Sequence, residues 1–195
     1  MPKRYLVPIS LVALLACGCL LVLGGTAVGS EEGARTIRIW DGCDPETFNE
    51  AIGPGTCLPG DHPTETFALF IEELTLDHVA GAWRFGSTKY TLPDGRSTVL
   101  NNRGGETHTF TRVAKFGGGF VPFLNDLSGT PVPAPECLQP PSDSSIFVPG
   151  ENSVPGPTAG SSAMPAGVSR FQCCIHPWMR TTVVVKDGTN SSHHE

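Results

Sequence analysis

Residues 171–180 read Phe-Gln-Cys-Cys-Ile-His-Pro-Trp-Met-Arg, and the rest of the sequence is best interpreted from this stretch. Within a few positions it offers the Cys173 thiolate, the His176 imidazole and the Met179 thioether as metal donors. One thiolate, two imidazoles and a weak axial thioether are the donors of a blue-copper site. A second histidine must come from elsewhere, and His108, in a strand-like segment, is the best placed. The sequence therefore predicts a single copper ion bound by these four side chains.

The residues around this loop favour a rigid site. We expect a strand to end at the cysteine and a tight turn to bring the histidine and the methionine back toward one point. Pro177 fixes its own backbone φ and restricts His176 to extended conformations. Residues 181–185, Thr-Thr-Val-Val-Val, are expected to form the next strand. Because rigid ligands hardly move between Cu(I) and Cu(II), such a loop suits electron transfer.

The spacing Cys-x₂-His-x₂-Met, preceded by an upstream histidine, resembles that of the cupredoxin family, small blue-copper electron carriers such as plastocyanin and amicyanin. The resemblance covers about residues 81–115 and 170–187. It implies a Greek-key β-sandwich, one mononuclear Cu(I)/Cu(II) centre, redox protein partners and no enzymatic activity. It also implies that Cys173 supplies the short copper–thiolate bond, that Met179 tunes the potential, and that the edge of His176 reaches an apolar surface where the electron leaves.

Cys173 and Cys174 cannot both point at one metal ion, because consecutive side chains of a strand face opposite sides of the sheet. Cys174 would give Cys-x-His, a spacing that the family does not use, so Cys173 is the expected ligand. The adjacent pair also disfavours a dinuclear copper-A site, which needs two bridging cysteines several residues apart. Thr109 stands where many family members have an asparagine that hydrogen-bonds across to the cysteine loop, and its hydroxyl can take this role.

Residues 1–29 have the pattern of an export signal. Basic residues precede an apolar run over about residues 5–23, and residues 27–29 (Ala-Val-Gly) form a suitable cleavage site. Two alternatives remain open. Residues 14–17 (Leu-Leu-Ala-Cys) resemble a bacterial lipobox, and the apolar run nearly reaches the roughly 20 residues that span a bilayer. All three interpretations predict export to the periplasm or the extracellular space, and the last two add a membrane anchor.

Export changes the interpretation of the cysteines that follow the signal: Cys43, Cys57, Cys137, Cys173 and Cys174. An odd number in an exported protein leaves one thiol for another role. One copper ligand and two disulfides account for all of them. If Cys173 binds copper, the other four allow three pairings. We favour Cys43–Cys57, which closes a 15-residue loop, together with Cys137–Cys174.

The charge of the chain disfavours a nucleic-acid partner. Without the signal, the 13 basic residues fall to 11 against 19 acidic ones, a formal charge of −8. Nucleic-acid binders need a basic footprint. An acidic chain is compatible with docking to a basic redox protein, and it also keeps an exported protein soluble. We expect a monomer.

Residues 30–80 are predicted to form an N-terminal extension with short helices and a disulfide clip. Asp44 and Pro45 are typical of a helix start, and Gly53 is typical of a helix end. A second helix is expected over about residues 66–74, where apolar side chains recur at helical spacing. Nothing in this extension carries obvious chemistry.

The remainder, residues 81–187, is predicted to be the cupredoxin domain, followed by a flexible tail over residues 188–195. Strands are expected over residues 35–40, 82–85, 89–92, 98–101, 107–113, 145–148 and 181–185. Between residues 116 and 169, 18 of 54 residues are Gly or Pro, so this insertion is predicted to form mostly long loops. It starts directly after the His108 strand. It therefore either folds over the copper site or is a loop without function.

Other metal sites fit the sequence less well. Multicopper oxidases and copper nitrite reductases need further histidines in His-x-His pairs, which this sequence lacks. Methionine is not a usual zinc ligand. The sequence therefore predicts an exported type 1 copper protein that carries single electrons between redox partners. The alternatives are an exported module that stores, delivers or senses copper, and a metal-free secreted β-domain in which Cys173 and Cys174 both form disulfides.

Overall fold

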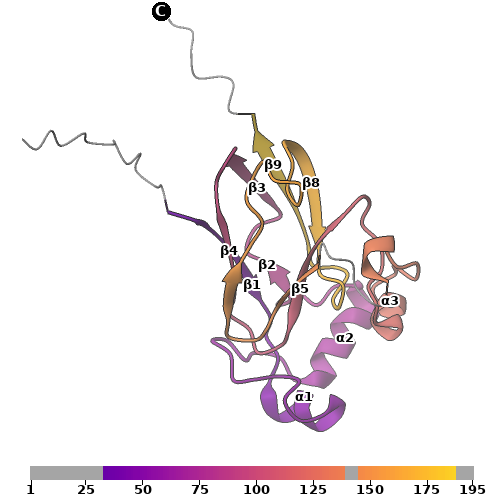
Figure 1. Cartoon of the computed structure of the whole chain (residues 1–195). Helices are drawn as coiled ribbons and strands as arrows, with labels where there is room; N and C mark the ends of the chain where they lie inside the picture. Colours follow the sequence, from indigo (N-terminus) through magenta and orange to yellow (C-terminus); the bar gives the residue numbers. More distant parts are fainter. Residues whose placement is uncertain (1–32, 139–144, 188–195) are drawn as a thin grey trace, which may run out of the picture. The chain divides into compact units, whose positions relative to one another are not determined.

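The structure is a computed structural model, and it describes residues 33–138 and 145–187 (Figure 1). The predicted export signal over residues 1–29 and the predicted tail over residues 188–195 lie outside the described residues. Within the described part, no helix has both the length and the apolar character needed to cross a bilayer.

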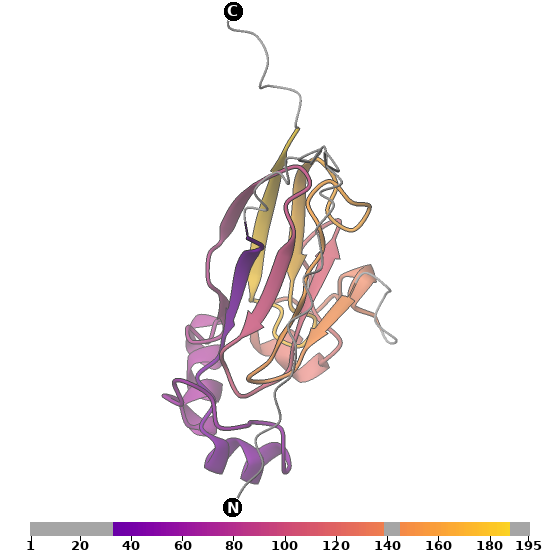
Figure 2. The same cartoon turned by 60° about the vertical axis from the view of Figure 1, so that its left-hand side comes forward.

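The described strands form two sheets that pack face to face (Figure 2). The four-stranded sheet has the order β2 (Arg84–Phe85), β1 (Arg35–Trp40), β4 (Thr98–Asn102) and β7 (Ser153–Pro155). The five-stranded sheet has the order β3 (Lys89–Pro93), β9 (Arg180–Lys186), β8 (Gly167–Gln172), β5 (His108–Val113) and β6 (Ser145–Val148). Two pairs, β1 with β4 and β3 with β9, are parallel, and the other pairs are antiparallel. The mainly β sandwich expected from the sequence is confirmed.

Alternate side chains of the two sheets make the core between them. In β1, Ile37 and Ile39 are buried and the residue between them is exposed, as the pleat of a strand requires. Phe85 of the first sheet meets Phe110 of the second edge to face, with ring centroids 5.4 Å apart. Phe110 stacks on Phe171 of the neighbouring strand at 4.2 Å. This core fixes the ends of β5 and β8, which carry the site described below.

The expected strands are present with ends shifted by a few residues, and β7 is an additional strand that the sequence did not predict. β1 lies inside residues 30–80, the range predicted as an extension. It nevertheless pairs with β4 from Arg35 to Ile39 and with β2 at its end. This strand is therefore an inner strand of the first sheet. Its alternating pattern predicted a strand, but a parallel partner some sixty residues away leaves no local signal.

Both predicted helices are present, at one end of the sandwich (Figure 1). α1 (Pro45–Ile52) begins after Asp44, whose carboxylate accepts a hydrogen bond from the Thr47 N–H at 3.0 Å. α2 (Phe67–Asp77) runs beyond its predicted end and stops at His78, whose backbone is left-handed with φ 62°.

The insertion over residues 116–169 contains more regular structure than expected. Besides β6 and β7 it holds a helix, α3 (Pro122–Leu127), and a 3₁₀ turn, η1 (Pro135–Cys137). The sequence did carry one signal for α3, because proline is favoured at the first position of a helix. Gly119 lies so close to the Cys174 carbonyl that a side chain would overlap it. The first part of the insertion therefore packs against the cysteine loop.

The two favoured disulfides, Cys43–Cys57 and Cys137–Cys174, are confirmed. Cys173 is the one free cysteine of the described residues, and it is buried. A metal-free domain with both adjacent cysteines in disulfides is thereby contradicted. The second disulfide connects the insertion to the loop between β8 and β9.

We expect that replacing the first disulfide, as Cys43→Ala with Cys57→Ala, lowers the free energy of unfolding of the metal-free protein by about 3 kcal/mol. Opening a 15-residue loop restores conformational freedom to the unfolded chain, and this loop size corresponds to about that value. Urea denaturation followed by tryptophan fluorescence measures the change. Alkylation of the unreduced, unfolded wild type is the control, and it should label Cys173 but neither Cys43 nor Cys57. An unchanged unfolding free energy would contradict the assignment.

Candidate metal centre

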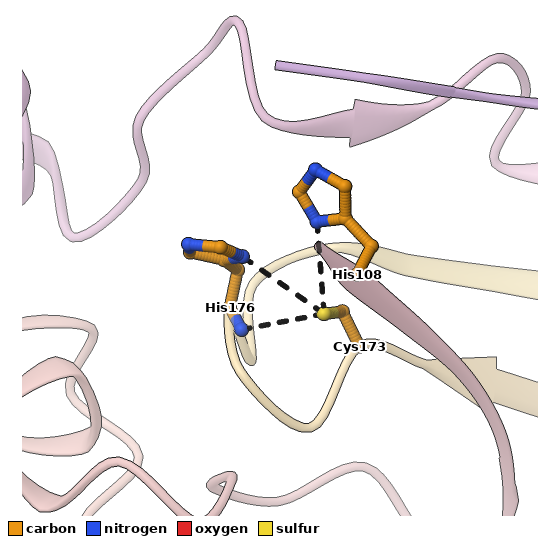
Figure 3. Close-up of side chains that lie close together, drawn as sticks. All are labelled: His108, Cys173 and His176. Carbon is orange, nitrogen blue, oxygen red and sulfur yellow. Dashed lines mark hydrogen bonds between the residues drawn. The ribbon is translucent and has the colours of Figure 1, made fainter. Parts of the chain in front are cut away.

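Three of the predicted ligands meet at one end of the five-stranded sheet (Figure 3). His108 is the first residue of β5, and Cys173 and His176 lie in the loop between β8 and β9. The Cys173 Sγ lies 3.8 Å from His108 Nδ1 and 3.9 Å from His176 Nδ1. For metal–ligand bonds of about 2.0–2.3 Å, such separations correspond to angles of about 120° at the metal. The donors are therefore arranged for a trigonal His₂Cys site.

Backbone hydrogen bonds close the loop around the cysteine. The Cys173 N–H donates to the Met179 carbonyl at 3.0 Å, and the Met179 N–H donates to the His176 carbonyl at 3.0 Å. The Cys173 Sγ in turn accepts from the Thr109 N–H at 3.3 Å and from the His176 N–H at 3.5 Å (Figure 3 shows the latter). These bonds place residue 179 beside residue 173 in the backbone, and the Met179 side chain is buried. Its role as the axial ligand stays a prediction.

A carboxylate lies at the outer nitrogen of each histidine. His108 Nε2 is 2.8 Å from Asp41 Oδ2, and His176 Nε2 is 3.4 Å from Glu106 Oε2. The Trp83 indole N–H donates to the same Glu106 oxygen at 2.5 Å. The carboxylate side chains are 1% and 8% exposed, respectively. With both Nε2 atoms facing carboxylates, the two Nδ1 atoms are the ones directed at the sulfur.

The Asp41 carboxylate is itself held by backbone groups. It accepts hydrogen bonds from the N–H groups of Cys43 at 3.3 Å, Gly105 at 3.0 Å and Glu106 at 3.1 Å. Gly104 packs so closely on this carboxylate that a Cβ would overlap it. The end of β1, the first disulfide and the turn before β5 are thus joined at one side chain.

The charges of the site stabilise one another. Burial acts to lower the pKa of His108, but hydrogen bonds and charge interactions with Asp41 and Cys173 outweigh it and raise the pKa to about 10. Burial acts to raise the pKa of Cys173, but hydrogen bonds from the two histidines and their positive charges hold it well below its usual value. The pKa of His176 is raised against burial, chiefly by the charge of Glu106. The metal-free site therefore favours a thiolate beside a protonated histidine.

An aromatic cover closes the site on the side of the N-terminal helices. The ring of Phe70, from α2, lies edge-on to His176 with centroids 6.4 Å apart, and it also contacts Trp83 at 4.5 Å and Trp178 at 5.9 Å. His176 is only 2% exposed. The expectation that its edge reaches the surface is therefore wrong. The resemblance to cupredoxins could not predict the burial of His176, because α2, which supplies Phe70, lies outside the residues that the resemblance covers.

An apolar cavity of about 350 Å³ lies beside His176. Side chains of α1, α2, α3 and the cysteine loop line it, and its ionisable wall residues are Glu106 and His176. Two of its apolar lining residues, Ile52 and Phe123, are 51% and 57% exposed. The cavity thus connects the buried imidazole with apolar protein surface.

The Thr109 hydroxyl links the two ligand-bearing segments, as expected from the sequence. It accepts a hydrogen bond from the Cys174 N–H at 2.7 Å. The Thr109 N–H and hydroxyl therefore hold both adjacent cysteines of the loop, one by its sulfur and the other by its backbone.

Sequence reasoning missed the two carboxylates. Glu106 stands two positions before His108, and a polar residue so close to a predicted ligand was an available signal. Asp41 lies 67 positions from His108. Nothing in the sequence connects them, since the contact depends on the parallel pairing of β1 with β4.

A second group of donor atoms, from Asp41, Cys43 and Glu106, also lies close together, but the Cys43 sulfur is in a disulfide and is not a thiolate ligand.

No protein-family model matches the chain, and no curated protein matches it. Solved structures do. A purple cupredoxin from Nitrosopumilus maritimus is 12% identical, with a TM-score of 0.40 over 78% of this chain and 99% of that chain. Auracyanin A, a blue copper protein from Chloroflexus aurantiacus, is 22% identical, with a TM-score of 0.32 over 53% and 89% of the two chains. A Cu(I) amicyanin mutant is 16% identical, with a TM-score of 0.32 over 53% and 73%. The chain is thus similar to solved cupredoxin structures at low identity, with TM-scores of 0.32–0.40.

We expect Thr109→Val to destabilise the protein by about 1–3 kcal/mol, because the buried Cys174 N–H loses its acceptor while the volume of the side chain is kept. Thermal or urea unfolding of the metal-free protein measures the loss. Thr109→Ser, which retains the hydroxyl, is the matched control and should be close to wild type. Equal stability of the valine and serine variants would contradict the role of this hydrogen bond.

We also expect metal binding to release a proton, since His108 has a pKa of about 10 in the metal-free site and must lose its proton to become a ligand. Because the pKa of His176 is raised as well, the apparent affinity for Cu(I) should rise by at least about tenfold for each pH unit between pH 6 and 8. Competition titration with a Cu(I) chelator measures it. The Cys173→Ser variant, which lacks the thiolate, is the control that measures Cu(I) binding elsewhere in the chain. A pH-independent affinity would contradict the protonated metal-free site.

Proposed function

We propose that this protein is an exported type 1 copper protein that carries single electrons between redox partners. The observation that carries the proposal is the convergence of His108 Nδ1 and His176 Nδ1 on the lone, buried Cys173 sulfur. A thiolate with two imidazoles in a trigonal arrangement fits copper, and its burial fits a site closed to solvent. When bound there, copper would supply a one-electron couple, with Met179 as the proposed axial ligand.

The surrounding residues hold the donors still. The loop is closed by the mutual hydrogen bonds of residues 173, 176 and 179, and it is tied to β5 through Thr109. The second disulfide fixes residue 174, next to the ligand. Donors held in this way change position little between the two oxidation states, which favours fast electron exchange. The burial of all three donors also favours electron transfer over the binding of a substrate to the ion, in support of a carrier rather than an enzyme.

The apolar cavity beside His176 supports a route for the electron. Phe70 covers His176, so the electron cannot leave directly through an imidazole edge at the surface. The exposed apolar side chains of Ile52 and Phe123, which line the cavity, offer a docking surface instead. We propose that redox proteins dock at this apolar surface and that nucleic acids are not partners. We also propose that the protein acts as a monomer.

Export is supported by the two disulfides, because disulfides form and persist in oxidising compartments. Together with the signal-like residues 1–29, they support a periplasmic or extracellular protein. Membrane anchoring through the N-terminus is compatible with the same residues.

Copper loading of the full chain tests the proposal. We expect one copper per chain, an intense visible thiolate-to-copper band, and reversible one-electron cycling. Cys173→Ser should abolish the band, and His78→Gln, at an exposed histidine, is the matched control that should keep it. Absence of the band would contradict a type 1 centre. Copper binding without reversible cycling would contradict electron transfer and favour storage, delivery or sensing of copper.

A further inference from the structure

We propose that Asp41 and Glu106 lower the reduction potential of the copper centre and fix the orientation of its two imidazoles. They act through His108 and His176 and are positioning residues, not ligands. The inference rests on the proposed function, which assigns the ligands but says nothing about these carboxylates.

The geometry assigns one carboxylate to each imidazole. A neutral imidazole carries a hydrogen on one nitrogen and a lone pair on the other. A hydrogen-bond acceptor beside one nitrogen determines that this nitrogen carries the hydrogen. The carboxylates lie at Nε2 of His108 and of His176, at 2.8 Å and 3.4 Å. In the neutral imidazoles that copper requires, each Nε2 would therefore donate to its carboxylate, and each Nδ1 would present its lone pair to the metal position beside the Cys173 sulfur. Both carboxylates lie at Nε2, away from the Nδ1 atoms that face Cys173, so neither is a metal ligand.

The charges of the carboxylates are not cancelled by basic side chains. Among the contacts of the described residues, the Asp41 carboxylate is held by backbone N–H groups and His108, and the Glu106 carboxylate by His176 and the Trp83 indole. In a buried site such charges are weakly screened. Two negative charges behind the imidazoles favour the more positive ion, Cu(II), over Cu(I), and therefore lower the potential.

The two carboxylates differ in how they are held, which makes their effects separable. Both oxygens of Asp41 accept backbone hydrogen bonds, so an amide at this position would place an NH₂ group against an N–H donor. Glu106 uses Oε2 for both Trp83 and His176, and none of the hydrogen bonds among described residues uses its Oε1. A glutamine can therefore keep the acceptor oxygen in place and turn its NH₂ group away. Glu106→Gln removes the charge and preserves the contact.

The test compares Glu106→Gln with Glu50→Gln, which removes the same charge from an exposed position on α1. In the copper-loaded full chain we expect Glu106→Gln to keep the visible band of the wild type. We expect the ratio of Cu(I) to Cu(II) affinity to rise by about tenfold, which corresponds to about 59 mV for one electron. Glu50→Gln should leave the ratio unchanged. Redox titration followed by absorbance measures the potential, and chelator competition measures the two affinities.

Two further variants separate charge from orientation. Glu106→Ala removes the hydrogen bond as well, so copper affinity should also fall, by about 10–100-fold. Asp41→Asn should raise the potential at least as much as Glu106→Gln, with a loss of stability seen in thermal unfolding. A potential for Glu106→Gln equal to that of Glu50→Gln, or below the wild type, overturns the inference. A wild type that binds copper with the expected band shows that this failure is not a failure of the proposed function, whereas a wild type without copper overturns both.

Discussion

The Cys173 sulfur is fully buried, and a buried anion is stable only where hydrogen bonds and positive charge surround it. Its surroundings meet this requirement from both sides. The backbone N–H groups of Thr109 and His176 donate to the sulfur, and the two imidazoles face it with their Nδ1 atoms. The rest of the site follows from this constraint, because each imidazole that balances the thiolate needs a partner of its own.

Those partners form an alternating series of charges across the interior, from Asp41 through His108, Cys173 and His176 to Glu106. Opposite charges at such short range in a weakly screening interior stabilise each other, and removing one would leave its neighbours unpaired. A metal ion bound here would take the place of the protons between the sulfur and the imidazoles. The same network thus serves the metal-free fold and the proposed copper centre.

The sequence was informative where the chemistry is local. The spacing of Cys173 and His176 predicted the loop, the count of cysteines predicted two disulfides and one free thiol, and Asp44 with Pro45 predicted the start of α1. It was uninformative for contacts between distant segments that no ligand motif or cysteine count connects. The partnership of Asp41 with His108 depends on sheet pairing, and the burial of His176 depends on how α2 packs. The helix in the insertion had a weak local signal, which its glycine- and proline-rich surroundings obscured.

The most direct test of the central claim is the crystal structure of the copper-loaded protein, with anomalous diffraction recorded at the copper absorption edge. We expect a single strong anomalous peak among His108 Nδ1, His176 Nδ1 and Cys173 Sγ, with the two carboxylates still at the outer nitrogens. An ion bound elsewhere in the chain, or no anomalous peak between these three side chains, would contradict it.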